Sequence, residues 1–252
     1  MADISFKGIN AAAKMGEYLA KAQYVPEAGM PDLIFLGGVS PAQCVKNFAD
    51  GYLDSFALSG TVLVDAADRF LTLEDSVYID TGMADVASST HYVLARFGAQ
   101  ESSFRSTYFG GDGVSSPYGV DLFMDGSTLK LWVGTWDEVS AGTRVEKALG
   151  GYSETGGSAP WALIRIDIDA VAGTVTLSDL TSSTSTSGVF GANVRETRNE
   201  NTVRIGSNYS NYYGERDISM ILRFPSILTT ADRAAVEAGI RKLALGELGV
   251  SV

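Results

Sequence analysis

The sequence has few of the residues that most often carry chemistry. Its 252 residues include one cysteine, Cys44, and one histidine, His91. A single cysteine can form neither an intrachain disulfide nor a CxxC site, and one cysteine with one histidine cannot supply a zinc ligand set. We therefore expect Cys44 to be a small buried hydrophobe and His91, inside the strand-like run 90–97, to have a structural role.

Positive charge is also scarce. The chain has 19 Lys and Arg against 30 Asp and Glu, so its formal net charge is -11. An acidic surface repels nucleic acid and anionic membranes unless basic residues cluster, and Lys and Arg are scattered along this sequence. We expect no nucleic-acid partner.

Long apolar runs are missing as well. No run approaches the roughly 18 apolar residues that a membrane span requires, and the first residues lack the basic and then apolar pattern of a signal peptide. We expect synthesis in a host cytoplasm with no signal peptide, and no membrane insertion. A protein made in the cytoplasm can still act outside the cell after the cell lyses.

The sequence does contain enough apolar material for a core. Hydrophobic residues make up 45% of the chain and charged residues 19%. From about residue 32 to 224, short runs rich in Val, Ile, Thr and aromatic residues alternate with clusters of Gly, Asp, Asn and Ser. This pattern predicts an all-β domain of two antiparallel sheets packed face to face.

Strict alternation marks the clearest predicted hairpin. Residues 164–169 alternate apolar and charged side chains, and residues 174–178 alternate in the same way after a short turn. Alternation with period two predicts one buried and one solvated face. Asp167 and Asp169 fall on the face that we expect to be solvated.

The dipeptide Asp125-Gly126 marks a second hairpin, because it tolerates the positive φ values of a tight turn between strands 119–124 and 127–133. The stretch 181–187 is all Ser and Thr and predicts an exposed loop. Further predicted strands are 61–64, 69–73, 76–80, 90–97, 105–109, 201–206 and 217–224.

Helical signals stand at the two ends. Residues 10–24 predict a short helix with a thin face of small residues, and Pro26 to Pro31 predict a linker. Residues 1–31 are therefore interpreted as a helical arm and 32–252 as the sandwich. A second helix is predicted after Thr229 or Thr230, with an apolar stripe at Val236, Ile240 and Leu243.

The order of these elements resembles a known family. A Trp-led hairpin (161–177), an Ile-Gly strand (204–206) and a last strand (218–224) lead into the helix signal 228–237, as in the closing half of concanavalin A-like lectin/glucanase domains, in particular the laminin-G-like ones. Segments 47–51, 70–73 and 78–82 resemble the opening half found in phage and prophage structural proteins. The resemblance spans about residues 45 to 244 and implies an antiparallel jelly-roll β-sandwich.

The sequence contains no recognisable catalytic set. Glucanases need two carboxylates about 5 Å apart, and the nearest candidates are Asp167 and Asp169, without a Glu-x-Asp-x-Glu pattern. No Gly-x-Ser-x-Gly elbow accompanies His91, and Gly110 to Gly113 lack the Lys of a phosphate loop. We expect no catalytic residue and no enzyme activity. We also expect no cofactor, with calcium at Asp112, or at Asp167 and Asp169, as the alternative.

Two aromatic groups are candidate binding surfaces. Tyr side chains with Asn, Glu and Arg stack on sugar rings and bind their hydroxyls, but they also build protein interfaces and ordinary loops. The candidate contact residues are Asn208, Tyr209, Asn211, Tyr212, Tyr213 and Arg216 in one segment, and Trp132 with Trp136 in another.

These observations lead to one hypothesis with two alternatives. The resemblance implies a non-enzymatic structural or appendage protein of a phage virion (tail, fibre, neck or capsid decoration) that binds subunits or a host receptor, including a cell-surface glycan. The arm 1–31 would contact other virion proteins, and a homo-oligomer is expected. The alternatives are a freestanding carbohydrate-binding module and a glycan-cleaving enzyme.

Overall fold

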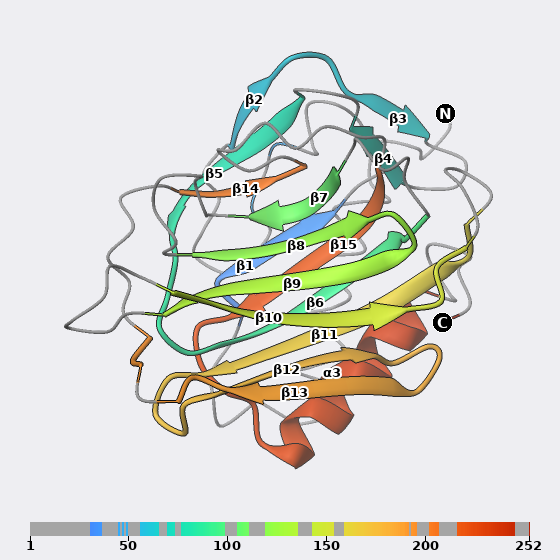
Figure 1. Cartoon of the computed structure of the whole chain (residues 1–252). Helices are drawn as coiled ribbons and strands as arrows, with labels where there is room; N and C mark the ends of the chain where they lie inside the picture. Colours follow the sequence, from blue (N-terminus) through green and yellow to red (C-terminus); the bar gives the residue numbers. More distant parts are fainter. Residues whose placement is uncertain are drawn as a thin grey trace.

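In the part of the chain that the structure describes, two antiparallel β-sheets form a sandwich with one helix on its outer side (Figure 1). This computed structural model describes residues 31–36, 45, 47, 49, 56–65, 70–73, 77–98, 105–110, 119–135, 143–153, 159–191, 193–195, 202–206, 216–244 and 252. The predicted all-β sandwich with a C-terminal helix is confirmed. The predicted helix 10–24 and Cys44 lie outside the described residues.

The first sheet is built around the long central strands that the sequence pattern predicted. It has eight strands in the order β13-β12-β11-β6-β15-β4-β3, and β1 also pairs with β15. Its members are β1 (Leu33–Leu36), β3 (Leu63–Asp65), β4 (Phe70–Leu73), β6 (Ser89–Arg96), β11 (Trp161–Asp169), β12 (Thr174–Asp179), β13 (Thr184–Val189) and β15 (Arg216–Phe224).

The second sheet faces the first. It has seven strands in the order β10-β9-β8-β7-β14-β5-β2. Its members are β2 (Ala57–Ser59), β5 (Tyr78–Ala84), β7 (Arg105–Gly110), β8 (Val120–Asp125), β9 (Thr128–Thr135), β10 (Thr143–Gly150) and β14 (Thr202–Ile205).

Both predicted hairpins are present. β11 pairs with β12 from Ile164 opposite Asp179, and β8 pairs with β9 through a turn in which Gly126 has a φ of 62°. The prediction of a loop at 181–187 is wrong, because Thr184–Val189 form β13 on the edge of the first sheet. Thr favours strands, and an edge strand whose inward positions are only partly buried does not need the apolar alternation that a buried strand shows.

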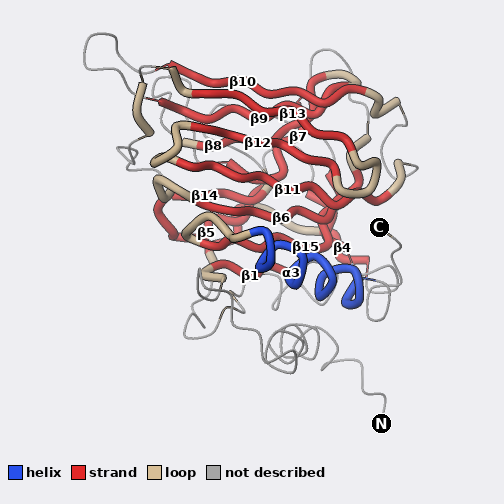
Figure 2. Tube along the Cα trace, turned by 90° about the horizontal axis from the view of Figure 1, so that it is seen from below, coloured by secondary structure: helices blue, strands red, loops and turns tan. Residues whose placement is uncertain are grey.

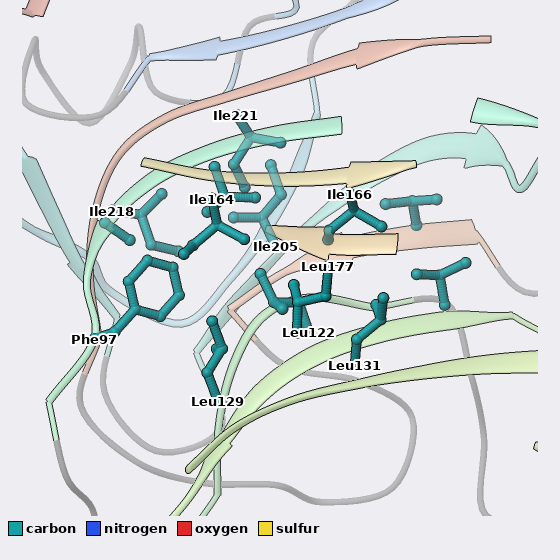
Figure 3. Packing of buried hydrophobic residues seen from close by; sticks show 14 of the residues in the cluster. Phe97, Leu122, Leu129, Leu131, Ile164, Ile166, Leu177, Ile205, Ile218 and Ile221 are labelled. Atoms are coloured by element: carbon teal, nitrogen blue, oxygen red, sulfur yellow. The ribbon is translucent and has the colours of Figure 1, made fainter. Parts of the chain in front are cut away.

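The main core fills the space between the sheets. Ile164 and Ile166 of β11 and Leu129 and Leu131 of β9 belong to one cluster of fully buried side chains (Figure 3). The alternating positions of these strands therefore point to the opposite sheet, as period two requires.

A second core lies between the first sheet and the helix α3 (Thr230–Leu243). Thr229 caps this helix through a reciprocal capping box with Asp232, which confirms the predicted start. Val236 and Ile240 pack in one buried cluster with outward-facing residues of β6, β11 and β15, among them Tyr92 and Leu163. Figure 2 shows α3 lying beside the first sheet, next to β15. The first sheet therefore has buried apolar side chains on both of its faces where α3 covers it.

Candidate functional site

The helix changes the position of Asp167, which the alternation placed on a solvated face. Asp167 is buried, its Oδ2 lies 3.0 Å from Nε of Arg165, and its Oδ1 lies 3.2 Å from Nη2 of Arg233 on α3. Arg165 reaches Glu237 at 2.6 Å, so two carboxylates and two guanidinium groups join β11 to α3. The expectation of a solvated Asp167 is wrong, because α3 covers that face.

Burial raises the pKa of Asp167, and the neighbouring guanidinium groups of Arg233 and Arg165 oppose that shift. Thr90 Oγ1 donates a further hydrogen bond to Oδ1 of Asp167 at 3.1 Å. Fixed pairing of both oxygens suits a carboxylate that docks a helix. It does not suit a nucleophile or proton donor, which must reach a substrate.

Asp169 lies two residues further, beyond the cover of the helix. Its Oδ1 accepts hydrogen bonds from the backbone N–H of Val171 at 3.0 Å and of Ala172 at 2.9 Å, which closes the β11–β12 turn. Among the described residues no group of three or more His, Cys, Asp or Glu could hold a metal ion. Asp112, the other calcium candidate, lies outside the described residues.

His91 is at the centre of β6, inside the sandwich. Its Nε2 lies 2.8 Å from Oγ of Ser89, and Arg223 stands directly opposite on β15. Burial lowers the pKa of His91 well below its usual value, and the charges of Arg223 and Arg195 lower it further. His91 is therefore neutral and packed in the interior, as the predicted structural role requires.

Trp132 points away from the core on the outer face of the second sheet. Its neighbours Leu131 and Val133 on β9 point inward, which sends Lys130 and Trp132 outward. The indole N–H donates to Oε2 of Glu146 at 2.7 Å. The guanidinium carbon of Arg144 lies 4.5 Å from the centre of the indole ring.

Charged side chains extend this group across three strands. Nζ of Lys130 lies 2.9 Å from Oδ2 of Asp125 and 3.4 Å from Oε1 of Glu146. The hydrogen bond with Asp125 raises the pKa of Lys130, so the amine is charged at neutral pH. We call the five residues of this surface, Asp125, Lys130, Trp132, Arg144 and Glu146, the Trp132 face.

The Trp132 face is held in one arrangement. Phe123 on β8 contacts the indole edge-on at 4.6 Å between ring centres, and Arg144 stacks on it. Glu146 and Arg144 were not predicted as site residues, because the mixed pattern of 143–150 was not recognised as a strand. Every second residue of β10 lies on the same side of the sheet as Trp132. In the register of β10 with β9, Glu146 stands directly opposite Trp132, Arg144 opposite Gly134 and Ala148 opposite Lys130. Recognising 143–150 as a strand would therefore have identified Arg144 and Glu146.

A second aromatic contact lies on β5 and β14 of the same sheet. Val203 and Ile205 point into the core, so Arg204 points outward, where its guanidinium carbon lies 4.2 Å from the ring centre of Tyr78. Asp80 is 3.5 Å from Nε of Arg204. The outer face of this sheet therefore has Arg-aromatic pairs on both sides of β7.

The other predicted contact residues are not tested by the structure. Arg216 is the first residue of β15, opposite Leu73 of β4. Outside the described residues lie Asn208, Tyr209, Asn211, Tyr212, Tyr213 and Trp136. Of the residues predicted to bind, Trp132 is the one whose surroundings can be described.

The fold is shared with solved receptor-binding domains of botulinum neurotoxins. The receptor-binding domain of the mosaic serotype C/D matches with a TM-score of 0.58 and 14% identity over 83% of this chain and 51% of that chain. The serotype D binding domain matches with a TM-score of 0.58 and 13% identity over 83% and 51%. For the type G receptor-binding domain the TM-score is 0.57, with 12% identity over the same shares.

These likenesses establish the fold. The chain spans about half the length of the toxin domains that it matches. No protein-family model and no curated protein sequence matches it. Within the described residues, no helix has the length and hydropathy needed to cross a membrane.

Proposed function

We propose that this chain is a non-catalytic recognition domain that binds a cell-surface glycan through the Trp132 face. The observation that carries the proposal is the indole of Trp132, fixed by Phe123, Arg144 and Glu146 and surrounded by charged hydrogen-bonding groups. A sugar presents apolar C–H groups and hydroxyls side by side. A rigid aromatic ring with carboxylates and cations around it offers a partner for each.

The place of this surface in the fold supports the same function. Helix α3 packs on the outer side of the first sheet, so the Trp132 face belongs to the opposite side of the molecule. Glu146 has 46% of its side chain exposed, and Arg144 is exposed as well. The neighbouring folds are described as receptor-binding domains, which favours recognition over catalysis for this architecture.

The proposal includes a place on a phage virion, as the sequence resemblance implies. There the domain would act as an appendage or structural subunit in a homo-oligomer, with residues 1–31 contacting other virion proteins. A freestanding carbohydrate-binding module would use the same face and is the alternative. A glycan-cleaving enzyme needs two carboxylates that reach the substrate. Asp167 does not fit that role, because its oxygens are paired with Arg165 and Arg233.

A glycan array probed with the full-length chain tests the function. We expect the unchanged chain to bind a small set of glycans selectively. Trp132→Ala removes the aromatic surface and should bind the same glycans at least about tenfold more weakly. Glu146→Gln should also weaken binding, because it removes a charged acceptor on an exposed strand.

The matched control is Ser185→Ala on β13, an exposed edge position of the other sheet. It should bind as the unchanged chain does. If no glycan binds, or if Trp132→Ala and Ser185→Ala bind equally, the proposed site is wrong. Detection of the chain in purified virions by mass spectrometry, or capsid, neck or tail genes beside its own, tests the virion assignment separately.

A further inference from the structure

Strands β11 and β13 finish at the same end of the sandwich (Figure 1). Among the described residues, four large apolar side chains are exposed, and three of them belong to this end: Val171 (97%), Val189 (69%) and Val194 (49%). The backbone N–H of Phe190 bonds to the carbonyl of Gly173, which places Val189 next to the β11–β12 turn. Exposed apolar side chains that gather in one place mark interaction surfaces.

Val171 stands at the rim of a cleft between three loops. The cleft has a volume of about 520 Å³ and lies between the β5–β6 loop, the β11–β12 turn and the segment that leads from β15 to α3. Its lining is mostly apolar and is completed by the hydroxyls of Ser88 and Ser226 and the carboxylate of Asp169. The cleft is shallow and largely open to solvent, so it suits a segment laid along the surface and not an enclosed small molecule.

Asp169 differs from the other carboxylates at this end. Asp32 pairs with Arg223, Asp85 with Arg195, and Asp167 with Arg165 and Arg233. In the part of the chain that the structure describes, Asp169 has no ion pair, and its Oδ1 accepts only the two N–H groups of its own turn. A negative charge therefore stands in the cleft with no cation assigned to it.

The β11–β12 turn that carries both groups is held in place. The backbone N–H of Ala170 donates to Oγ of Ser88 at 3.0 Å, which ties the turn to the β5–β6 loop. Because Oγ of Ser88 accepts that bond, its own O–H remains a donor toward a ligand. The carboxylate of Asp169 and the side chain of Val171 are thus presented on a supported turn.

We propose that this cleft binds a polypeptide segment of a partner protein in which a Lys or Arg side chain stands beside an aliphatic one. The cation pairs with Asp169, and the aliphatic group covers Val171 and the apolar wall formed by Val86, Pro225 and Ile227. The formal charge of -11 on the whole chain favours the approach of a basic partner. This site lies away from the Trp132 face and does not depend on the proposed glycan function.

Two other ligands fit the cleft less well. A metal ion needs several oxygen ligands, and the described residues contain no group of three acidic or metal-binding side chains. A sugar is usually held against an aromatic ring, and none of the residues that line this cleft is aromatic. The charge, the aliphatic wall and the exposed Val171 together favour a basic-aliphatic peptide.

Fluorescence anisotropy with labelled ten-residue peptides tests the site on the full-length chain. We expect a peptide with Leu-Lys-Leu at its centre to bind, more weakly as salt is raised, and a matched Leu-Glu-Leu peptide to fail. Asp169→Asn keeps the side-chain oxygen that the turn N–H groups need and removes the charge. This variant should bind the Lys peptide with about tenfold lower affinity, as the loss of one charge pair implies.

Val171→Ser should weaken binding of the same peptide. Leu58→Ser, at an exposed apolar position on β2 of the other sheet, should leave that binding unchanged. Equal binding by the unchanged chain and Asp169→Asn, or no binding of the Lys peptide at millimolar concentration, would overturn the proposal. A calorimetric titration with calcium chloride alone tests a metal site at the same carboxylate. If the unchanged chain gives a heat of binding that Asp169→Asn lacks, Asp169 binds a metal ion and the peptide proposal is overturned.

Discussion

Arg223 and Asp32 form a two-point ion pair that joins the last strand of the sandwich to the first described one. Nε of Arg223 lies 2.9 Å from Oδ1 of Asp32, and Nη2 lies 2.7 Å from Oδ2. Nη1 of Arg223 also donates to the carbonyl of Ala84 at 2.8 Å. Because Arg223 is 2% exposed, this pairing compensates the cost of burying its charge and fixes β1 beside β15.

Loss of this pair should destabilise the protein strongly. Asp32→Asn leaves the buried guanidinium of Arg223 without its counter-charge, and we expect the free energy of unfolding to fall by about 3 kcal/mol in urea titrations. Asp169→Asn is the control, because it removes a carboxylate without an ion pair among the described residues and should change stability by less than about 0.5 kcal/mol. Similar losses in the two variants would contradict this role of Arg223.

Stability should fall as the solution becomes mildly acidic. Burial, with the charges of Arg223 and Arg195, holds the pKa of His91 in the folded state well below its usual value. The unfolded chain, with a pKa of about 6.5, therefore takes up a proton first. The stabilising contribution is complete above about pH 6.5 and is lost progressively as pH falls below it.

The variant His91→Gln separates this effect from that of other groups. Between pH 7.5 and 5.5 the unchanged chain should lose about 1.4 kcal/mol more stability than the variant, measured by urea unfolding at each pH. Asp167, whose pKa is raised, contributes to both proteins and cancels in the difference. Parallel pH profiles for the two proteins would show that His91 takes no part.

The polar contacts under α3 should hold that helix in place. Asp167→Asn weakens the pairing with Arg233 on α3 and with Arg165 on β11. We expect a loss of about 2 kcal/mol in unfolding free energy, because guanidinium groups remain half-buried with a weaker partner. Hydrogen exchange of the α3 amides should accelerate.

Glu146→Gln is the control for that measurement, because it changes an exposed surface ion pair on the opposite sheet. It should leave both the unfolding free energy and the α3 exchange rates close to those of the unchanged chain, since exposed pairs contribute little. If Asp167→Asn also leaves α3 exchange unchanged, packing of Val236 and Ile240 alone docks the helix.

Two glycines with positive φ should respond differently to substitution by alanine. Gly206 has a φ of 96°, and a Cβ there would lie 2.2 Å from Cδ1 of Leu73 and 3.2 Å from the carbonyl oxygen of Val77. Gly82 has a φ of 67° with no atom within 4 Å of its Cβ position. Gly82→Ala should lower the free energy of unfolding by about 1 kcal/mol, from backbone strain alone. Gly206→Ala should lower it clearly more, and thermal unfolding of both variants measures the difference. Equal costs would show that Leu73 yields without penalty.

Local patterns predicted much of the fold because they report local physics. The Asp125-Gly126 turn needs positive φ, and the strand 164–169 needs one apolar side every second residue. The start of α3 follows from Thr229 and Asp232, which satisfy the N–H groups at the end of the helix. Each of these features depends on residues that are neighbours in sequence.

Other features could not be predicted, because their cause lies far along the chain. The solvated or buried state of Asp167 depends on α3, which brings Arg233 to it from 66 positions away in the sequence. β13 is a strand because β12 pairs with it, although its Ser and Thr residues have no alternation. Glu146 joins Trp132 because β10 pairs with β9 in the register that sets them opposite.

The sequence by itself therefore determined the all-β class, the main hairpins, the capped C-terminal helix and the structural role of His91, since alternation, turn residues and caps act over a few residues. The tertiary structure decided which faces meet water. Docking of α3 buried Asp167 and left Asp169 in the cleft beside the exposed Val171. Strand pairing placed Arg144 and Glu146 around Trp132, because distant segments become neighbours only through the register of the sheets.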